Sequence, residues 1–229
     1  MDQKAFESDL LRQPSNICEP DSRTHLFVRV DRKNGQSREL EIQDKYDFVA
    51  SFQLKESVPK NVFIHFETAK NLYLYSWFVY RFYSVAEQQA LASLEFALRE
   101  RFPGYFKQNP RAGLGKLLKY AIKNGYLKNE LFTRREHWAW QRAKQRLSFE
   151  MLDRMRGEDL TEIRWSEADV VVTDEDLNYN WLEDFMEIMP DIRNNHAHGS
   201  ANLYPASVGR TFEIVSELIN QLFSGAAGQ

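Results

Sequence analysis

The helical spacing of apolar residues in two long segments constrains the fold more than any other feature of the chain. In residues 79–102 the apolar stripe is Leu91, Leu94, Leu98 and Phe102. In residues 207–223 it is Val208, Phe212, Val215, Ile219 and Leu222. Intervals of three and four place these side chains on one face of an α-helix, and another element must cover that face. The sequence therefore predicts a packed bundle of helices.

Shorter helical patterns lie between and before these two segments. Residues 61–77 join residues 79–102 in one long or broken helical region, which the Phe-Pro-Gly sequence at 102–104 ends. Further helices are predicted over residues 113–127, 129–155 and 181–189. Residues 157–180 are acidic and predict a loop, with a short strand possible at 170–173.

The start of the chain has a different pattern. Residues 26–30 and 38–42 tend to alternate apolar and polar side chains, and Lys33-Asn34-Gly35 lies between them. Asn-Gly tolerates positive φ, so this stretch predicts a β-hairpin. We expect an all-α protein with a small N-terminal β-hairpin, divided into an N-terminal segment over 1–58 and a helical domain over 59–229.

Composition points to a soluble cytoplasmic protein. The 229 residues carry a formal charge of −3 and a single cysteine, Cys18, which excludes an intramolecular disulfide framework. The chain does not start with the basic-then-apolar order of a signal peptide. It has no apolar run long enough to cross a membrane.

Charge is strongly partitioned along the chain. Residues 99–146 hold thirteen Lys or Arg against three Glu, and residues 147–191 hold three Arg against fourteen Asp or Glu. Two interpretations are open. The two regions pair with each other or with a second subunit, or the basic region forms a surface for a nucleic-acid backbone.

Two carboxylates flank the stripe of residues 91–102. Glu87 and Glu95 both fall near its edge on a helix. A buried acid needs a partner or loses its charge. Either these side chains extend to the edge of the stripe and reach water, or another helix supplies an arginine or a histidine.

Residues 190–199 concentrate polar chemistry, with the sequence Pro-Asp-Ile-Arg-Asn-Asn-His-Ala-His-Gly. Arg193 carries a permanent planar cation that fits phosphate, and His198 has a proton that moves near neutral pH. In an uninterrupted helix the two would point about 140° apart. Pro190 and Gly199 favour a helix start, a helix end or a distorted turn, in which both side chains can face one way.

Other interpretations of this stretch remain open. It would also fit an ordinary helix-to-loop junction, with Arg193 paired to Asp191 or Glu187 and the histidines exposed. A zinc site is disfavoured because His196 and His198 are two apart, no cysteine is near, and no His-Glu-x-x-His pattern occurs. The sequence therefore predicts no metal and no cofactor. Residues 113–116, Gly-Leu-Gly-Lys, are too short for a phosphate loop of the Gly-x-x-x-x-Gly-Lys type.

The spacing Arg193-Asn194-x-x-x-His198 resembles the Arg-x4–6-His signature of the HEPN superfamily. Residues 190–199 are similar to the Arg-Asn-x-x-Ala-His-Gly form of bacterial HEPN proteins, and residues 92–101 look like their earlier acidic helix. The resemblance covers roughly residues 60–223 and leaves the hairpin outside. It implies a helical bundle that dimerises and brings two Arg/His pairs into one cleft.

The resemblance also implies roles for individual residues. His198 would act as general acid or base, and His196 would replace it if the turn is tighter. Arg193 would bind the scissile phosphate, and Asn194 would orient it or fix the histidine tautomer. Glu95 would support Arg193. Independently of the resemblance, if the basic region is a nucleic-acid surface, Lys116, Lys119 and Lys123 would bind the RNA backbone.

We therefore expect a HEPN-like, metal-independent endoribonuclease that acts on RNA as a homodimer in toxin or phage-defence systems. In a toxin–antitoxin system a cognate antitoxin would be a further partner. RNA supplies its own 2′-hydroxyl nucleophile, so products would carry 2′,3′-cyclic phosphates. The alternatives are a non-catalytic HEPN-like module that binds a nucleotide, RNA or a partner protein, and a purely structural helical dimer.

Overall fold

A computed structural model describes residues 7–31, 35–197 and 204–225; the side chains of residues 7 and 195–197 fall outside that description. The described elements begin with two 3-10 turns, Glu7–Asp9 and Ser22–Leu26, and the strands β1 (Val28–Val30) and β2 (Ser37–Glu39). The helices are α1 (Ile42–Ala50), α2 (Lys60–Tyr75), α3 (Phe82–Arg101), α4 (Pro103–Gln108), α5 (Leu114–Lys123), α6 (Arg135–Gly157), α7 (Asp174–Leu177), α8 (Trp181–Ala197) and α9 (Pro205–Leu222). Further 3-10 turns lie at Asn129–Leu131 and Glu167–Asp169. The all-α prediction with a small hairpin is confirmed.

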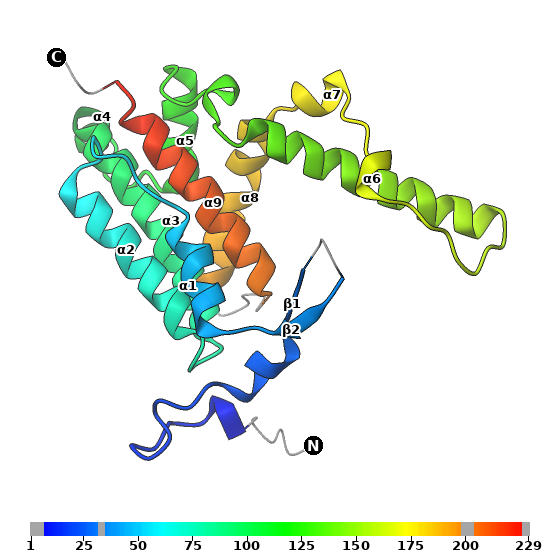
Figure 1. Cartoon of the computed structure of the whole chain (residues 1–229). Helices are drawn as coiled ribbons and strands as arrows, with labels where there is room; N and C mark the ends of the chain where they lie inside the picture. Colours follow the sequence, from blue (N-terminus) through cyan, green and yellow to red (C-terminus); the bar gives the residue numbers. More distant parts are fainter. Residues whose placement is uncertain (1–6, 32–34, 198–203, 226–229) are drawn as a thin grey trace, which may run out of the picture.

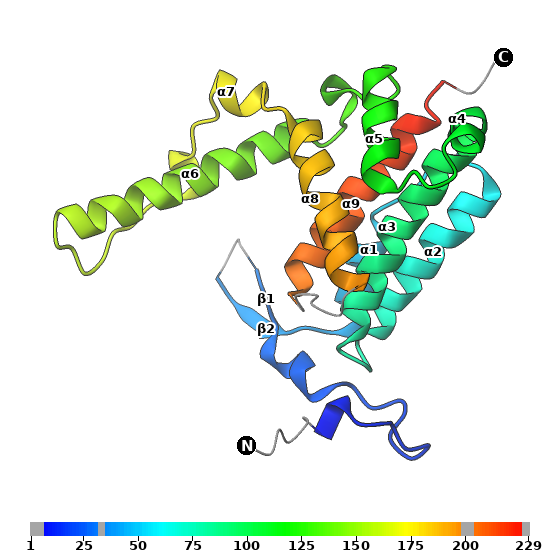
Figure 2. The same ribbon diagram turned by 180° about the vertical axis from the view of Figure 1, so that it is seen from behind.

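The core lies between α2, α3 and α9, which run alongside one another in Figures 1 and 2. The predicted stripe of α3 is buried along its length, with Leu91, Leu94 and Leu98 fully enclosed. All five predicted core positions of α9 are buried as well. The helix α8 and the short α5 pack on each other and on α3, so α3 contacts every helix that lines the site described below.

The hairpin is shorter than expected, and a helix begins where the second strand was predicted to continue. Strand β1 pairs antiparallel with β2, with Val28 opposite Glu39. Gly35 has a φ of +70°, in the left-handed region that favours glycine in a turn; residues 32–34 lie outside the described part. The prediction of strand through residue 42 is wrong, because Ile42 is the first residue of α1.

Asp44 ties the hairpin to α1. Its carboxylate accepts two hydrogen bonds from Arg38 of β2, at 2.7 and 2.6 Å, and a further one from Arg29 of β1. It also accepts the backbone N–H of Glu41 at 2.9 Å, which caps the start of the helix. The Arg38 contact and these other donors outweigh burial and hold the pKa of Asp44 well below its usual range.

The N-terminal segment shares the core of the helical domain. Val49, Phe52 and Val58 are buried in the same cluster as the α2, α3 and α9 side chains. Phe48 also lies against Gly209 of α9, where a Cβ would come within 2.7 Å of its ring. One core therefore includes residues from both sides of position 58.

Helix α8 continues through Pro190, contrary to the expectation that a helix ends near residue 189. It spans Trp181–Ala197 with Pro190 inside it. Proline has no N–H to donate, so the carbonyl four residues earlier loses its usual partner within the helix. Neither a helix start nor a helix end occurs between Pro190 and Ala197, and Arg193 and Asn194 are helical residues.

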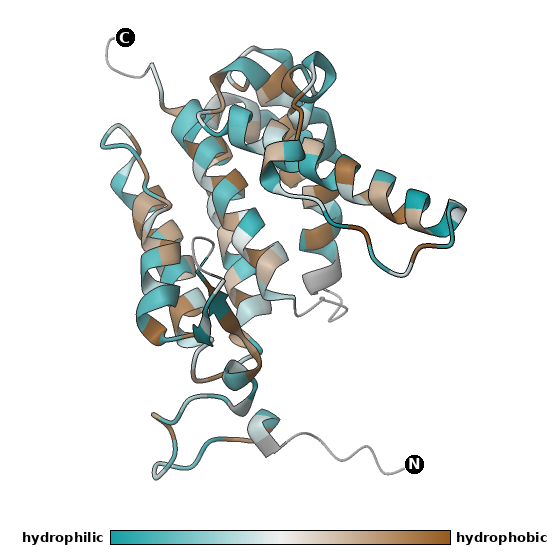
Figure 3. Cartoon of the chain, turned by 45° about the vertical axis from the view of Figure 1, so that its right-hand side comes forward, coloured by the Kyte–Doolittle hydropathy of each residue, from teal (hydrophilic) through white to brown (hydrophobic). Residues whose placement is uncertain are grey.

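Helix α6 extends away from the bundle, and the acidic segment that follows it runs back along it (Figures 1 and 2). Asp176 of α7, almost fully buried, contacts Arg146 at 2.8 Å and Arg142 at 3.3 Å. Lys144 lies 2.7 Å from Glu167. For these residues of α6, the interpretation that basic and acidic regions pair with each other is confirmed. Figure 3 shows apolar residues interspersed with polar ones along this arm; Phe149 and Leu152 are among its exposed side chains.

The strand considered for residues 170–173 does not form; these residues have no regular secondary structure and lead into α7. No helix in the described part of the chain combines the length and apolar character needed to span a bilayer.

Candidate functional site: a cationic pocket between two helices

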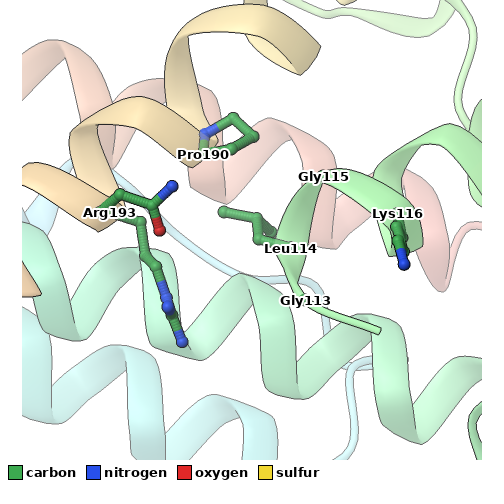
Figure 4. A pocket seen from close by; sticks show the side chains of 7 residues that line it. Gly113, Leu114, Gly115, Lys116, Pro190 and Arg193 are labelled. Atoms are coloured by element: carbon green, nitrogen blue, oxygen red, sulfur yellow. The ribbon is translucent and has the colours of Figure 1, made fainter. Parts of the chain in front are cut away.

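A pocket of about 280 Å³ opens between α8 and the N-terminal end of α5. Helix α8 contributes Pro190, Arg193 and Asn194 to its lining, and the start of α5 contributes Gly113, Leu114, Gly115 and Lys116. Figure 4 shows Arg193 extending from α8 toward α3, with Lys116 on the other side of Gly113 and Leu114. Two cationic side chains and an amide thus lie at one opening.

The N-terminus of α5 adds backbone donors to this pocket. Gly113 occupies the N-cap position, and its lack of a side chain leaves no capping oxygen for the first turn. The first N–H groups of a helix have no partner within it, and they carry the positive end of the helix dipole. An anion in the pocket would therefore meet free donors as well as side-chain charge.

Gly115 lets α5 approach α8 closely. A Cβ at this position would lie 3.1 Å from Cγ of Pro190, tighter than ordinary van der Waals contact. The ring of Pro190 lies against α5 at Gly115. These two residues together set the distance between the two helices. This distance determines how near Lys116 and Arg193 come to a common ligand.

Glu95 supplies the partner of Arg193 from the neighbouring helix α3. One of its carboxylate oxygens lies 3.7 Å from a guanidinium nitrogen of Arg193, and the other pairs with Arg99 one turn along α3. The Glu95 side chain is 10% exposed, whereas that of Arg193 is 46% exposed. Glu95 is thus held inside the bundle between two arginines, and the Arg193 guanidinium remains open to a ligand. The alternative in which Arg193 pairs with Asp191 or Glu187 is not what the structure shows.

The second acid of the stripe has a different environment. Glu87 is buried on α3 and accepts a hydrogen bond of 2.6 Å from the hydroxyl of Thr211 on α9. It is not among the residues that line the pocket between α8 and α5.

Arg99 was not anticipated as part of the site. Besides its pair with Glu95, its guanidinium carbon lies 4.5 Å from the ring centre of Phe106 on α4. A cation over an aromatic face is attracted by the ring quadrupole. The pattern of an arginine four residues after a buried acid on the same helix was available in the sequence.

The three lysines predicted to bind RNA separate into one that lines the pocket and two that do not. Lys116, Lys119 and Lys123 are all exposed along α5. Lys116 lines the pocket, and the other two continue along the helix away from it. No ion pair is recorded for any of the three within the described residues.

The two histidines of the predicted site cannot be placed with the rest. His198 lies outside the described residues, directly after the end of α8. His196 lies in the helical backbone of α8, but its side chain is outside the description. The structure therefore brings together Arg193, Asn194, Glu95 and Lys116, and leaves the histidine positions as predictions.

Sequence reasoning missed the glycines. Residues 113–116 are too short for a phosphate loop, but they carry another signal. Two glycines lie within the three residues before Lys116 at a helix start, which leaves backbone donors accessible. Within the described part of the chain, no group of three or more His, Cys, Asp or Glu residues is arranged to hold a metal ion.

The fold and the pocket together define an all-α protein with a pocket between two helices that a lysine and an arginine line. No family model, no curated protein and no solved structure matches this chain.

Proposed function

We propose that this protein is a HEPN-like, metal-independent endoribonuclease. The observation that carries the proposal is the placement of Arg193. Its guanidinium lies next to the buried carboxylate of Glu95, and the arginine side chain itself is half exposed. It lines a pocket together with Asn194 and Lys116. A guanidinium held by a carboxylate is oriented before a ligand arrives, and its remaining N–H groups suit a phosphate.

The reaction needs only proton transfer and charge stabilisation, because RNA carries the nucleophile. The 2′-hydroxyl oxygen attacks the adjacent phosphorus while the bond from phosphorus to the 5′-oxygen breaks. His198 would accept the 2′ proton or donate a proton to the departing 5′-oxygen. Arg193 would stabilise the charge that builds on the phosphate oxygens, and Asn194 and the first N–H groups of α5 would hold the phosphate. The products are a 2′,3′-cyclic phosphate and a 5′-hydroxyl.

A homodimer completes the proposal. Two copies of His198 in one cleft would allow one imidazole to remove the 2′ proton while the other protonates the leaving oxygen. We place the protein in the cytoplasm as a toxin or phage-defence effector, where a cognate antitoxin would cover the cleft.

A binding module is the second candidate, and one observation favours it. The described residues that line the pocket supply positive charge and hydrogen-bond donors, from Arg193, Lys116 and Asn194. These groups would bind a phosphate group by themselves. The same pocket would then hold a nucleotide, RNA or a phosphorylated partner.

An RNA cleavage assay in excess EDTA tests the proposal. Wild type is compared with Arg193→Ala and His198→Ala, each verified for fold by circular dichroism and for dimer mass. The matched control is Arg156→Ala, which removes an exposed arginine near the end of α6. We expect wild type and the control to cleave RNA and to leave cyclic-phosphate ends. We expect no cleavage by Arg193→Ala or His198→Ala. Absence of cleavage by all four, with phosphate-dependent binding retained, would favour the binding module. Equal cleavage by all four would place the activity elsewhere.

A further inference from the structure

The surface next to the pocket combines unpaired cations with tyrosine rings. Residues 101–129 contain seven Lys or Arg and no Asp or Glu. Among the described residues no ion pair is recorded for these seven, whereas Arg142, Lys144 and Arg146 of α6 all pair with acids. The charge partition therefore has two outcomes. Arg142, Lys144 and Arg146 of α6 are paired with acids within the chain. The basic residues of 101–129 have no such pair among the described residues and are left for a ligand.

Helix α5 arranges this charge in a row. Lys116, Tyr120 and Lys123 follow at intervals of four and three, so they lie on one face of the helix, with Lys119 beside them. Seven residues of helix span about 10 Å, which is comparable with a few nucleotides of a strand that carries one charge every 3.4 Å or so. Lys116 at one end of the row also lines the pocket, so the row begins at the proposed site.

Tyr120 belongs to an aromatic platform that α4 completes. Its ring stacks on that of Tyr105, with centroids 3.9 Å apart and planes 24° from parallel. Phe102 packs against Tyr120 and against Tyr126, and the guanidinium of Arg101 lies over Tyr126. Tyr105 and Tyr120 are half-buried, and Tyr126 is exposed. Figures 1 and 2 both place α4 and α5 next to each other at the same end of the bundle.

We propose that this surface, formed by Tyr105, Tyr120 and Tyr126 with Lys116, Lys119 and Lys123, binds single-stranded nucleic acid and leads it into the pocket. Tyrosine rings stack on unpaired bases whatever their sequence, while lysines follow the backbone phosphates. A duplex hides its base faces inside its own stack, so it would engage the lysines alone. An acidic protein would likewise meet the charge and leave the rings unused. The part of the inference that leads the strand into the pocket rests on the proposed function. Binding of the strand to this surface does not depend on cleavage.

Binding of an uncleavable probe tests the inference. The probe is a 12-nucleotide 2′-O-methyl RNA of mixed sequence, measured by fluorescence anisotropy as a single strand and as a duplex. We expect the single strand to bind more tightly, and Tyr105→Leu to weaken its binding on the order of tenfold, since one base stack contributes about that factor. Tyr105→Phe keeps the ring and should restore the affinity. The matched control is Tyr75→Leu, which changes an exposed tyrosine at the C-terminal end of α2.

Several outcomes would overturn the inference. These are equal affinity for single strand and duplex, no difference between Tyr105→Leu and wild type, and no binding at all. Thermal unfolding of each variant verifies that the fold is intact. The EDTA assay separates this test from that of the proposed function. A protein that binds through Tyr105 and never cleaves RNA would contradict only the ribonuclease, and one that cleaves RNA regardless of Tyr105 would contradict only the stacking surface.

Discussion

Glu95 on α3 reaches Arg193 on α8 across 3.7 Å, although its other carboxylate oxygen is already paired with Arg99. The two residues come from helices far apart in the sequence, and Glu95 is the more buried partner. A buried carboxylate that serves two arginines fixes the direction of both. Arg193 is thus presented to the pocket by a group that itself does not line it.

Replacing Glu95 should weaken the function of Arg193 without removing the arginine. We expect Glu95→Gln to lower kcat/KM for RNA by about fivefold, because an ion pair at 3.7 Å with a half-exposed arginine contributes up to about 1 kcal/mol. The loss should appear mainly in kcat, because Arg193 still binds the phosphate but its guanidinium is no longer held in one orientation. Glu100→Gln, an exposed residue on the same helix, is the control and should change nothing. Full activity in Glu95→Gln beside a dead Arg193→Ala would show that the anchor is dispensable.

The contact between Gly115 and Pro190 makes a second prediction, about the width of the pocket. Gly115→Ala would place a methyl group 3.1 Å from the proline ring, so α5 and α8 must separate slightly. Crowding costs about 1–3 kcal/mol, and the better helix propensity of alanine offsets up to about 1 kcal/mol. We expect the free energy of unfolding, measured in urea, to fall by a net value of about 1 kcal/mol. We expect RNA affinity to fall by a larger fraction than the free energy of unfolding. Gly157→Ala, with open space around it, should cost nothing in either measurement; an equally neutral Gly115→Ala would mean that the helix spacing is adjustable.

Lys45 makes the stability of the fold depend on pH. It is buried on α1, donates a hydrogen bond of 2.5 Å to Ser76, and lies 4.2 Å from the ring centre of Tyr83 and 5.4 Å from that of Tyr73. Burial lowers the pKa of Lys45 to about 7, against a smaller opposite effect of the negative charge of Asp21. The unfolded chain keeps this proton up to an ordinary lysine value of about 10.5. Between these two values the unfolded state binds more protons, so this residue makes stability rise with pH.

The variant Lys45→Met isolates that effect. We expect it to be more stable than wild type at pH 6, with a difference that is largest below pH 7 and shrinks by on the order of 1 kcal/mol per pH unit above it. Urea unfolding at pH 6, 7, 8 and 9, followed by tryptophan fluorescence, measures the difference. Lys60→Met, at an exposed position of α2, should give a difference that does not vary with pH. A constant difference for Lys45→Met would mean that the lysine stays charged in the folded state.

The helices with regular apolar spacing were predictable because their pattern is local and repeated. The stripe from Leu91 to Phe102 and the face from Val208 to Leu222 are both buried as their spacing indicated. The start of α1 was not predicted, because residues 38–42 alternate over only five positions and such a short pattern also fits a strand. The local sequence signal of a helix start was the acid Asp44 three residues after Glu41; in the structure its carboxylate accepts the Glu41 N–H.

The C-terminal end of α8 was predicted too early because of Pro190. Proline removes one hydrogen bond, and sequence rules then favour a helix boundary. The apolar face of this helix, with Trp181, Phe185 and Met189 buried, packs in the core up to Pro190, and the helix continues past it. Tertiary packing thus outweighed the local cost. The pocket was harder still to predict, because Gly113, Glu95 and Arg193 come from three helices whose mutual placement no local pattern contains.

The lysines of α5 make the last prediction, about salt. Each phosphate contact of a single strand contributes roughly 0.7 to the slope of log affinity against log salt. The triple variant Lys116→Gln, Lys119→Gln, Lys123→Gln should therefore reduce that slope by about 2 for the 2′-O-methyl single strand. Lys144→Gln is the control, because Lys144 already lies 2.7 Å from Glu167 within the chain. We expect it to leave the slope unchanged. If both variants reduce the slope alike, the charge of α6 is as available to a ligand as that of α5, and the distinction between neutralised and unpaired cations is wrong.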